Sequence, residues 1–306
     1  MSFSVTLATV ALMLVYTIPG YLLMKKKLVQ PDSISTLATL LLYVCSPFQT
    51  IYAMQQIEYS TYMLTYLAIT LGLGFLLMGG VMAILYFITA KKQTEVPWRI
   101  CITAAVMGNC GFMGIPLLEA LLPEYPQSVG FASMFFVAYN VLMWTMVSFI
   151  ITRDKKYISL KKIFLNPSVI AMGIALVMFF AKIKLTGQVA DVVTLLSKMC
   201  TPLCMLILGM RLALVPIKPM FTSGIQYAAI VLKLLVFPLL ALAVCSILPL
   251  EREYAVGIYI LGCAPVGNMV LSFAELLGEG QDTAANVVLL STLLSMVTIP
   301  LMLILI

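Results

Sequence analysis

The sequence predicts an all-α integral membrane protein in which ten helices cross the bilayer. Of its 306 residues, 62% are hydrophobic and only 10% are charged, whereas a soluble domain carries about 25% charged residues. Apolar stretches of about 20 residues, the length that crosses a bilayer, recur along the whole chain. One water-soluble core cannot bury so many apolar side chains, so lipid is the main solvent predicted for this protein.

Each predicted helix is an apolar stretch bounded by polar residues, glycine or proline. The first five are predicted at Phe3–Met24, Ile34–Gln55, Tyr62–Thr89, Pro97–Leu122 and Ser128–Ile151. The second five are predicted at Pro167–Ala181, Val189–Leu212, Phe221–Leu248, Glu253–Leu277 and Thr283–Ile306.

Basic residues fall in alternate loops and therefore predict the orientation of the chain. One series of loops holds Lys25–Lys27, then Lys91, Lys92 and Arg99, then Arg153, Lys155, Lys156, Lys161 and Lys162, then Arg211 and Lys218. By the positive-inside rule this series is cytoplasmic. We therefore expect a multi-pass protein of a bacterial-type plasma (inner) membrane, with both termini outside.

The longest loop, residues 152–165, divides the chain into a first repeat of five helices (1–151) and a second (166–306). An odd number of crossings per half inverts the second half relative to the first. Short motifs recur in the same order: Cys45-Ser46-Pro47 matches Cys200-Thr201-Pro202, and Gly114-Ile115-Pro116 matches Cys263-Ala264-Pro265. The sequence thus predicts an inverted repeat joined by a cytoplasmic linker.

The fourth and ninth helices each contain a segment that is unsuited to a continuous helix. Residues 108–116 contain Gly108, Gly111, Gly114 and Pro116, and residues 262–268 contain Gly262, Pro265 and Gly267. Glycine and proline destabilise helix interiors. A helix that breaks at mid-membrane frees backbone groups that protein, water or a ligand must satisfy, and two half-helix N-termini favour an anion. Close helix packing with a simple proline kink is the alternative interpretation.

Other polar residues inside the predicted spans are candidates for coupling or for lining the site. Lys233, near the middle of the eighth helix, is predicted to face a substrate carboxylate or to occupy the place of a coupling cation, unless it only reaches a water-filled crevice. Glu119 and Glu275 either carry a coupling proton or are solvated at the interface. Asn140 bonds the substrate or a neighbouring helix. The residues predicted to line the site from kinked helices are Ser46, Pro47, Thr201 and Pro202.

The motif of the fourth helix, Gly108-Asn109-x-Gly111-Phe112-x-Gly114-x-Pro116, together with Ala264-Pro265-x-Gly267-Asn268 in the ninth, resembles the auxin efflux carrier family, including its bacterial members. The resemblance covers essentially the whole chain. It implies a fold similar to that of sodium–bile acid symporters, in which helices 4 and 9 cross near the midplane. Helices 1, 2, 6 and 7 would form a scaffold, and helices 3–5 and 8–10 would move against it. It further implies small organic anion substrates, a site at Asn109, Pro116, Pro265 and Asn268, and a homodimer formed through the scaffold helices. We add Gly111, of the same motif, to the predicted substrate-binding residues.

We therefore predict a secondary transporter of a small organic anion, a carboxylate or an auxin-like molecule, working by alternating access. The alternatives are a membrane receptor or scaffold that binds without translocating, and a sodium-coupled symporter of the bile acid type; a channel is a further possibility. The absence of histidine from the sequence removes the usual acid–base and metal-ligand chemistry, so no enzyme, no metal site and no cofactor is predicted. A coupling ion, H⁺ or Na⁺, is left open. Lipid and the substrate are the expected partners, and nucleic acid is not.

Overall fold

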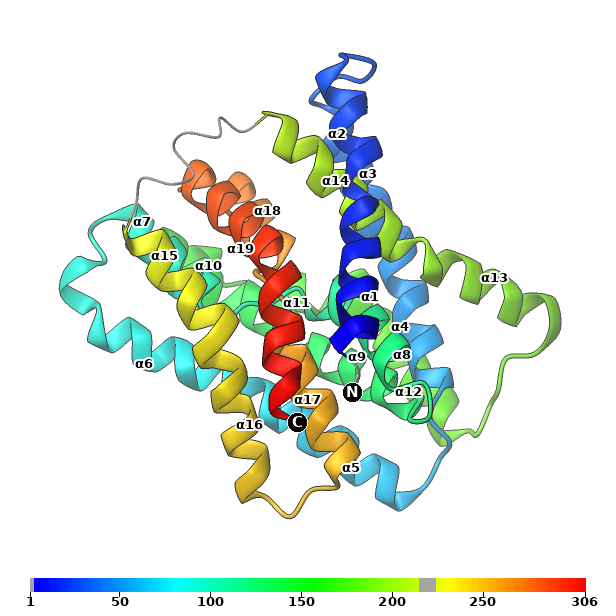
Figure 1. Cartoon of the computed structure of the whole chain (residues 1–306). Helices are drawn as coiled ribbons and strands as arrows, with labels where there is room; N and C mark the ends of the chain where they lie inside the picture. The colour runs from blue at the N-terminus through cyan, green and yellow to red at the C-terminus, as the bar shows by residue number, and fades with distance from the viewer. Residues whose placement is uncertain (1–2, 215–223) are drawn as a thin grey trace.

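The computed structural model describes residues 3–214 and 224–306, and in these residues the regular elements are helices (Figure 1). Eight helical stretches of the described chain are long and apolar enough to cross a membrane: Leu7–Lys25, Ser33–Gln55, Thr61–Ile88, Gln127–Thr152, Lys155–Phe180, Gly187–Leu214, Gly224–Ile247 and Gln281–Leu305. Two shorter apolar helices run Cys110–Leu121 and Asn268–Leu277. The chain is therefore a multi-pass helical membrane protein.

The first half of the chain contains α1 (Phe3–Val15), α2 (Thr17–Lys25), α3 (Ser33–Leu40), α4 (Ser46–Gln55), α5 (Thr61–Gly74), α6 (Val81–Ile88), α7 (Val96–Ala104), α8 (Ile115–Leu121), α9 (Gln127–Leu142) and α10 (Ser148–Thr152). The second half contains α11 (Leu160–Phe164), α12 (Pro167–Phe180), α13 (Gly187–Lys198), α14 (Cys200–Leu214), α15 (Gly224–Val231), α16 (Phe237–Ile247), α17 (Arg252–Cys263), α18 (Asn268–Leu277) and α19 (Gln281–Met302).

Most of the predicted helix boundaries lie within three residues of those in the structure, and the differences are local. The first predicted helix is divided at Tyr16 and the seventh at Met199. The expected linker 152–165 is not a plain loop, because it contains a 3₁₀ turn, η6 (Lys155–Tyr157), followed by α11. The predicted start of the eighth helix, Phe221, and the loop residue Lys218 lie outside the described residues.

Several helices contain a π-helical turn. Three of the turns lie near the centre of a span: η1 (Leu41–Cys45), η2 (Phe75–Gly80) and η8 (Leu232–Val236). A fourth, η5 (Met143–Val147), lies in the second half of its span, and η4 (Cys110–Gly114) opens the second part of an interrupted helix. The position of a proline accounts for part of this set. Three of these turns come directly before the first turn of a helix that contains Pro47, Pro116 or Pro238. Proline has no N–H and its ring clashes with the carbonyl four residues earlier, which favours a wider turn at this point.

The fourth and ninth predicted helices are each interrupted. The first ends as α7 at Ala104 and resumes at Cys110 with η4 and α8. The second ends as α17 at Cys263 and resumes at Asn268 with α18. The glycine- and proline-rich segments that the sequence singled out therefore do break the helix, and a simple kink does not describe them.

Helices α2 and α14 approach each other closely through their backbones. A Cβ atom added at Gly209 would lie 1.9 Å from the carbonyl oxygen of Thr17, and one added at Gly20 would lie 2.0 Å from that of Leu206. Small residues allow such contact between membrane helices.

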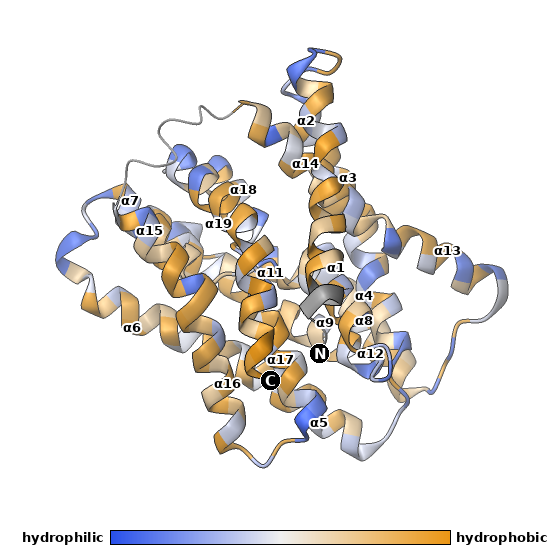
Figure 2. Cartoon of the chain, viewed as in Figure 1, coloured by the Kyte–Doolittle hydropathy of each residue, from blue (hydrophilic) through white to orange (hydrophobic). Residues whose placement is uncertain are grey.

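Apolar residues cover the length of most helices, and hydrophilic residues gather towards their ends and in the loops (Figure 2). Both termini lie at the same end of the molecule, opposite the loop that follows α2 (Figure 1). The arrangement suits a protein whose outer surface contacts lipid.

Candidate functional site

The two interrupted helices meet at their gaps and pair there through the backbone; this meeting point is called the crossing below. Gly108 and Val266 form an isolated antiparallel β-bridge. The Asn109 amide N–H donates to the Pro265 carbonyl at 2.7 Å, and the Gly267 N–H donates to the Met107 carbonyl at 2.9 Å. Each gap thus satisfies backbone groups that the other leaves open, which a low-dielectric environment requires.

Side chains of neighbouring helices satisfy further backbone groups at the crossing. The Gln49 amide of α4 donates to the Gly111 carbonyl at 3.3 Å, and the Thr201 hydroxyl of α14 donates to the Phe112 carbonyl at 3.0 Å. The Val266 N–H donates to the Ser291 hydroxyl of α19 at 3.2 Å. Contacts from three helices therefore hold the broken segments in place.

Two of the predicted binding residues, Asn109 and Asn268, meet at one point. The Asn268 amide donates to the Cys204 sulfur at 3.2 Å, and the Asn109 side chain lies near the same sulfur. Asn109 comes just before η4, and Asn268 is the first residue of α18. Both side chains are buried, and both lie where a half-helix presents its unpaired N–H groups.

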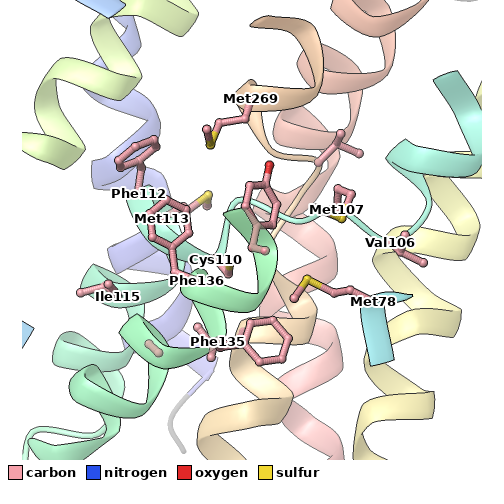
Figure 3. Packing of buried hydrophobic residues seen from close by; sticks show 14 of the residues in the cluster. Met78, Val106, Met107, Cys110, Phe112, Met113, Ile115, Phe135, Phe136 and Met269 are labelled. Atoms are coloured by element: carbon pink, nitrogen blue, oxygen red, sulfur yellow. The ribbon is translucent and has the colours of Figure 1, made fainter. Parts of the chain in front are cut away.

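The apolar packing around the crossing is dense and rich in sulfur. Met107, Cys110 and Met113 approach it from one interrupted segment, and Met269 approaches from the other (Figure 3). A Cβ atom at Gly111 would lie 2.9 Å from the Phe136 ring, so only glycine fits there without displacing the ring. The aromatic neighbour explains the glycine in the predicted motif.

Lys233 lies in η8 against the same crossing and is fully buried, with an exposed fraction of 0%. Its ammonium donates to the Gly262 carbonyl at 2.8 Å and lies 4.2 Å from the centre of the Phe237 ring. The lysine that the sequence analysis singled out near the middle of a span therefore has a specific backbone carbonyl as its partner.

A cavity of about 340 Å³ reaches one side of the crossing. It is lined by residues that include Gln49, Pro116, Glu119, Thr201 and Pro202. Glu119 lies near the Tyr52 hydroxyl and near Lys198. Pro116, Glu119, Thr201 and Pro202, four of the predicted site residues, are thus brought to one cavity.

A larger cavity of about 840 Å³ opens between α3, α12, α14 and α18. Arg211 and Glu275 form an ion pair of 3.0 Å in its wall. Trp144 and Phe273, also lining residues, pack edge to face with ring centres 4.6 Å apart. This cavity is amphipathic, with aromatic walls and a buried guanidinium.

Not all predicted site residues lie at the crossing. Asn140 donates to the Phe136 carbonyl of its own helix at 2.8 Å and accepts from Asn166, the N-cap of α12, at 3.2 Å. The Ser46 hydroxyl lies 2.6 Å from the Ser168 hydroxyl. In these positions Asn140 and Ser46 connect helices to one another, while Pro47 sits in the first turn of α4 after a π turn.

The sequence analysis did not single out Gln49, Cys204, Ser291 or Arg211 as site residues. Gln49 lies two residues after Pro47, and Cys204 follows Pro202 by two, so a search for polar or sulfur groups within one turn of the helix-bending prolines would have found both. Ser291 carries no such signal, because its role depends on which residue of another helix lies opposite.

Among residues 3–214 and 224–306, no three side chains of histidine, cysteine, aspartate or glutamate gather in a way that could hold a metal ion. The polar groups described at the crossing are amides, hydroxyls, thiols and the ammonium of Lys233. They can bind and orient a ligand by hydrogen bonds.

Comparison with known proteins places the chain in a family. The sequence profile of the family described as membrane transport protein matches residues 5–159 and 153–303. No curated protein matches the sequence significantly. The matched residues include both interrupted helices and nearly the whole length of the chain, and this agrees with the resemblance found in the motifs at 108–116 and 264–268. The chain therefore belongs to the membrane transport protein family of auxin efflux carriers.

Proposed function

We propose that the protein is a secondary transporter that carries a small organic anion across a membrane by alternating access. The observation that supports this most is the backbone pairing of two interrupted helices, Asn109 with Pro265 and Gly267 with Met107. Discontinuous helices that meet within the membrane form the substrate sites of many secondary transporters. Here two buried asparagine side chains flank the point where they meet.

We further propose that the interrupted helices are the fourth and ninth of ten spans, in two halves related by inversion. Two contacts between the halves support this. Equivalent gaps pair with each other at Gly108 and Val266. The thiols of Cys45 and Cys200, which open the matching Cys-Ser-Pro and Cys-Thr-Pro motifs, lie next to each other. Contact between equivalent residues is what a two-fold axis through the crossing produces.

The two cavities support alternating access. The second span supplies Ser35 and Leu42, from its first half, to the larger cavity, and Gln49, from its second half, to the smaller one. The cavities therefore approach the crossing from opposite ends of the span. In our proposal helices 3–5 and 8–10 move against helices 1, 2, 6 and 7. The Arg211–Glu275 pair, which joins α14 to α18, must separate or slide when they do.

A small organic anion is the substrate class that the site fits best. Two half-helix N-termini and the amides of Asn109 and Asn268 offer hydrogen-bond donors, and donors of this kind suit a carboxylate. The aromatic walls at Trp144 and Phe273 suit an apolar body. Together they favour an amphipathic carboxylate over an inorganic anion.

Uptake by the purified protein in proteoliposomes tests this proposal. Candidate carboxylates are first ranked by the increase that each causes in the midpoint of thermal unfolding. The double variant Asn109→Ala/Asn268→Ala is then expected to take up the best ligand with an apparent affinity reduced by at least about tenfold, because two hydrogen-bond donors to an anion are lost.

The control variant is Asn286→Ala, which removes a buried asparagine of α19 that belongs to neither interrupted helix; it is expected to transport like the wild type. Unchanged saturable uptake by the double variant would contradict the assignment of the site. Ligand binding without counterflow in wild-type vesicles would contradict transport and favour a receptor.

A further inference from the structure

Lys233 has an environment that a lysine rarely occupies in a membrane protein. Its exposed fraction is 0%, and it lies in a π turn near the centre of the span Gly224–Ile247. Its ammonium already donates to a backbone carbonyl, that of Gly262. This bond argues against a role as the carboxylate partner of the substrate.

No carboxylate within the described chain forms an ion pair with Lys233. A buried charge without compensation is strongly unfavourable, so the neighbouring dipoles must stabilise the ammonium. The Gly262 carbonyl, 2.8 Å from Nζ, belongs to the last turn of α17, where the helix dipole is negative. The Phe237 ring adds a cation–π contact.

The backbone of the other interrupted helix, at Gly108, lies against the same ammonium. A Cβ atom built at Gly108 would be 2.9 Å from the Lys233 Nζ and 3.3 Å from the Ala264 carbonyl oxygen. The ammonium is thus enclosed by the end of one interrupted helix and by the backbone of the other. Carbonyls at the C-terminal ends of broken helices are the groups that hold a coupling cation in secondary transporters.

We infer that Lys233 is a positioning residue whose ammonium occupies a monovalent-cation site at the crossing, so that the protein carries this cation covalently. The positive charge then stays at the crossing in every state of the cycle and does not need to be loaded from solution. One consequence of this inference rests on the proposed function: if the protein is a transporter, uptake needs no Na⁺ bound at the crossing.

The test uses a cavity of defined shape. Lys233→Ala removes a fragment the size of propylammonium and leaves the carbonyls without their cation. Propylammonium is expected to raise the midpoint of thermal unfolding of purified Lys233→Ala saturably, and 1-propanol, which has a similar chain without the charge, is expected not to. Neither compound is expected to stabilise the wild type or Lys233→Met, in which the space is filled.

Transport gives a second measurement. Wild-type uptake is expected to be the same when Na⁺ is replaced by N-methylglucammonium. Uptake by Lys233→Ala and Lys233→Met is expected to fall by about tenfold or more, as for the loss of a charge-assisted hydrogen bond. Propylammonium should restore uptake to the first variant and not to the second.

Three outcomes would overturn the inference: uptake by Lys233→Met at the wild-type rate, no selective stabilisation of Lys233→Ala by propylammonium, or saturable Na⁺ dependence of wild-type uptake. If Lys233→Ala does not fold, the other two measurements still decide. The thermal measurement does not depend on transport and therefore tests the inference by itself. A failure of the proposed function would be seen separately, because the wild type would then take up none of the candidate anions.

Discussion

Polar side chains within the spans at the crossing mainly serve the backbone. Gln49 and Thr201 donate to carbonyls that the first interrupted helix leaves open, and Ser291 accepts from the second. In a bilayer a freed backbone group has no water with which to form a hydrogen bond, so each of these side chains replaces a bond that an unbroken helix would have made itself. The break is therefore tolerated because neighbouring helices complete it.

Replacing Thr201 by valine tests this role. The change keeps the shape but leaves the Phe112 carbonyl without its donor, and the expected loss of stability is about 1–3 kcal/mol. Chemical unfolding in detergent measures it. Thr145→Val is the matched control, because the Thr145 hydroxyl only donates to the carbonyl of Val141 in its own helix, and its effect should be close to zero. Equal effects of the two substitutions would contradict the role given to Thr201.

Part of the candidate site can be predicted from residue identity alone. Asn109 and Asn268 can be singled out because each is polar, lies in an apolar span and adjoins glycine and proline. Their partners cannot be predicted in this way, because a hydrogen bond between α14 and α18 depends on how helices far apart in sequence pack. Asn140 shows the same limit: its type indicated a buried hydrogen bond, but only the structure shows that the partner is Asn166.

At the scale of elements, the distance between α2 and α14 is tightly constrained. Gly20 and Gly209 place each helix backbone against a carbonyl of the other. There is no side chain that can move aside, so the interhelical distance is fixed by the backbones themselves. A rigid pair of this kind suits the stationary part of a transporter.

Gly209→Ala is expected to be among the most damaging substitutions in the chain. The new methyl group would meet the Thr17 carbonyl at 1.9 Å, and forcing the helices apart should cost about 3 kcal/mol or more. Thermal unfolding and the yield of monodisperse protein measure the effect. Gly173→Ala in α12 is the control, since no atom lies within 4 Å of its added Cβ and helix propensity should raise stability by up to about 1 kcal/mol. Similar results for both variants would contradict the close contact.

The helices themselves were well predicted, since apolar length and flanking glycine, proline and charge mark where a span begins and ends. The π turns were not, although three of them come before prolines that the sequence shows. A proline predicts a disturbance of the helix, but whether the helix kinks, widens or stops depends on what its neighbours offer to the freed carbonyls.

At the scale of the whole molecule, the orientation remains a prediction from loop charge, and the structure makes it easy to test. All seven cysteines are at most 3% exposed, so a cysteine introduced in a loop can be labelled without removing the native ones. Lys26→Cys and Glu58→Cys place thiols at exposed positions in successive loops.

In intact cells a membrane-impermeant maleimide is expected to label Glu58→Cys at once and Lys26→Cys only after permeabilisation, because basic loops remain in the cytoplasm. The unmodified protein is the control for background labelling. Labelling of Lys26→Cys alone in intact cells would reverse the proposed orientation.

The pairing between Gly108 and Val266 also bears on how the protein is made. The two residues are separated by about 160 positions, and contacts between such distant segments form late in folding. Until the ribosome has synthesised the second segment, the first one is in the membrane with its backbone groups open. A newly inserted N-terminal half is therefore an unfinished structure, and its last hydrogen bonds form only when its counterpart reaches the same depth in the bilayer.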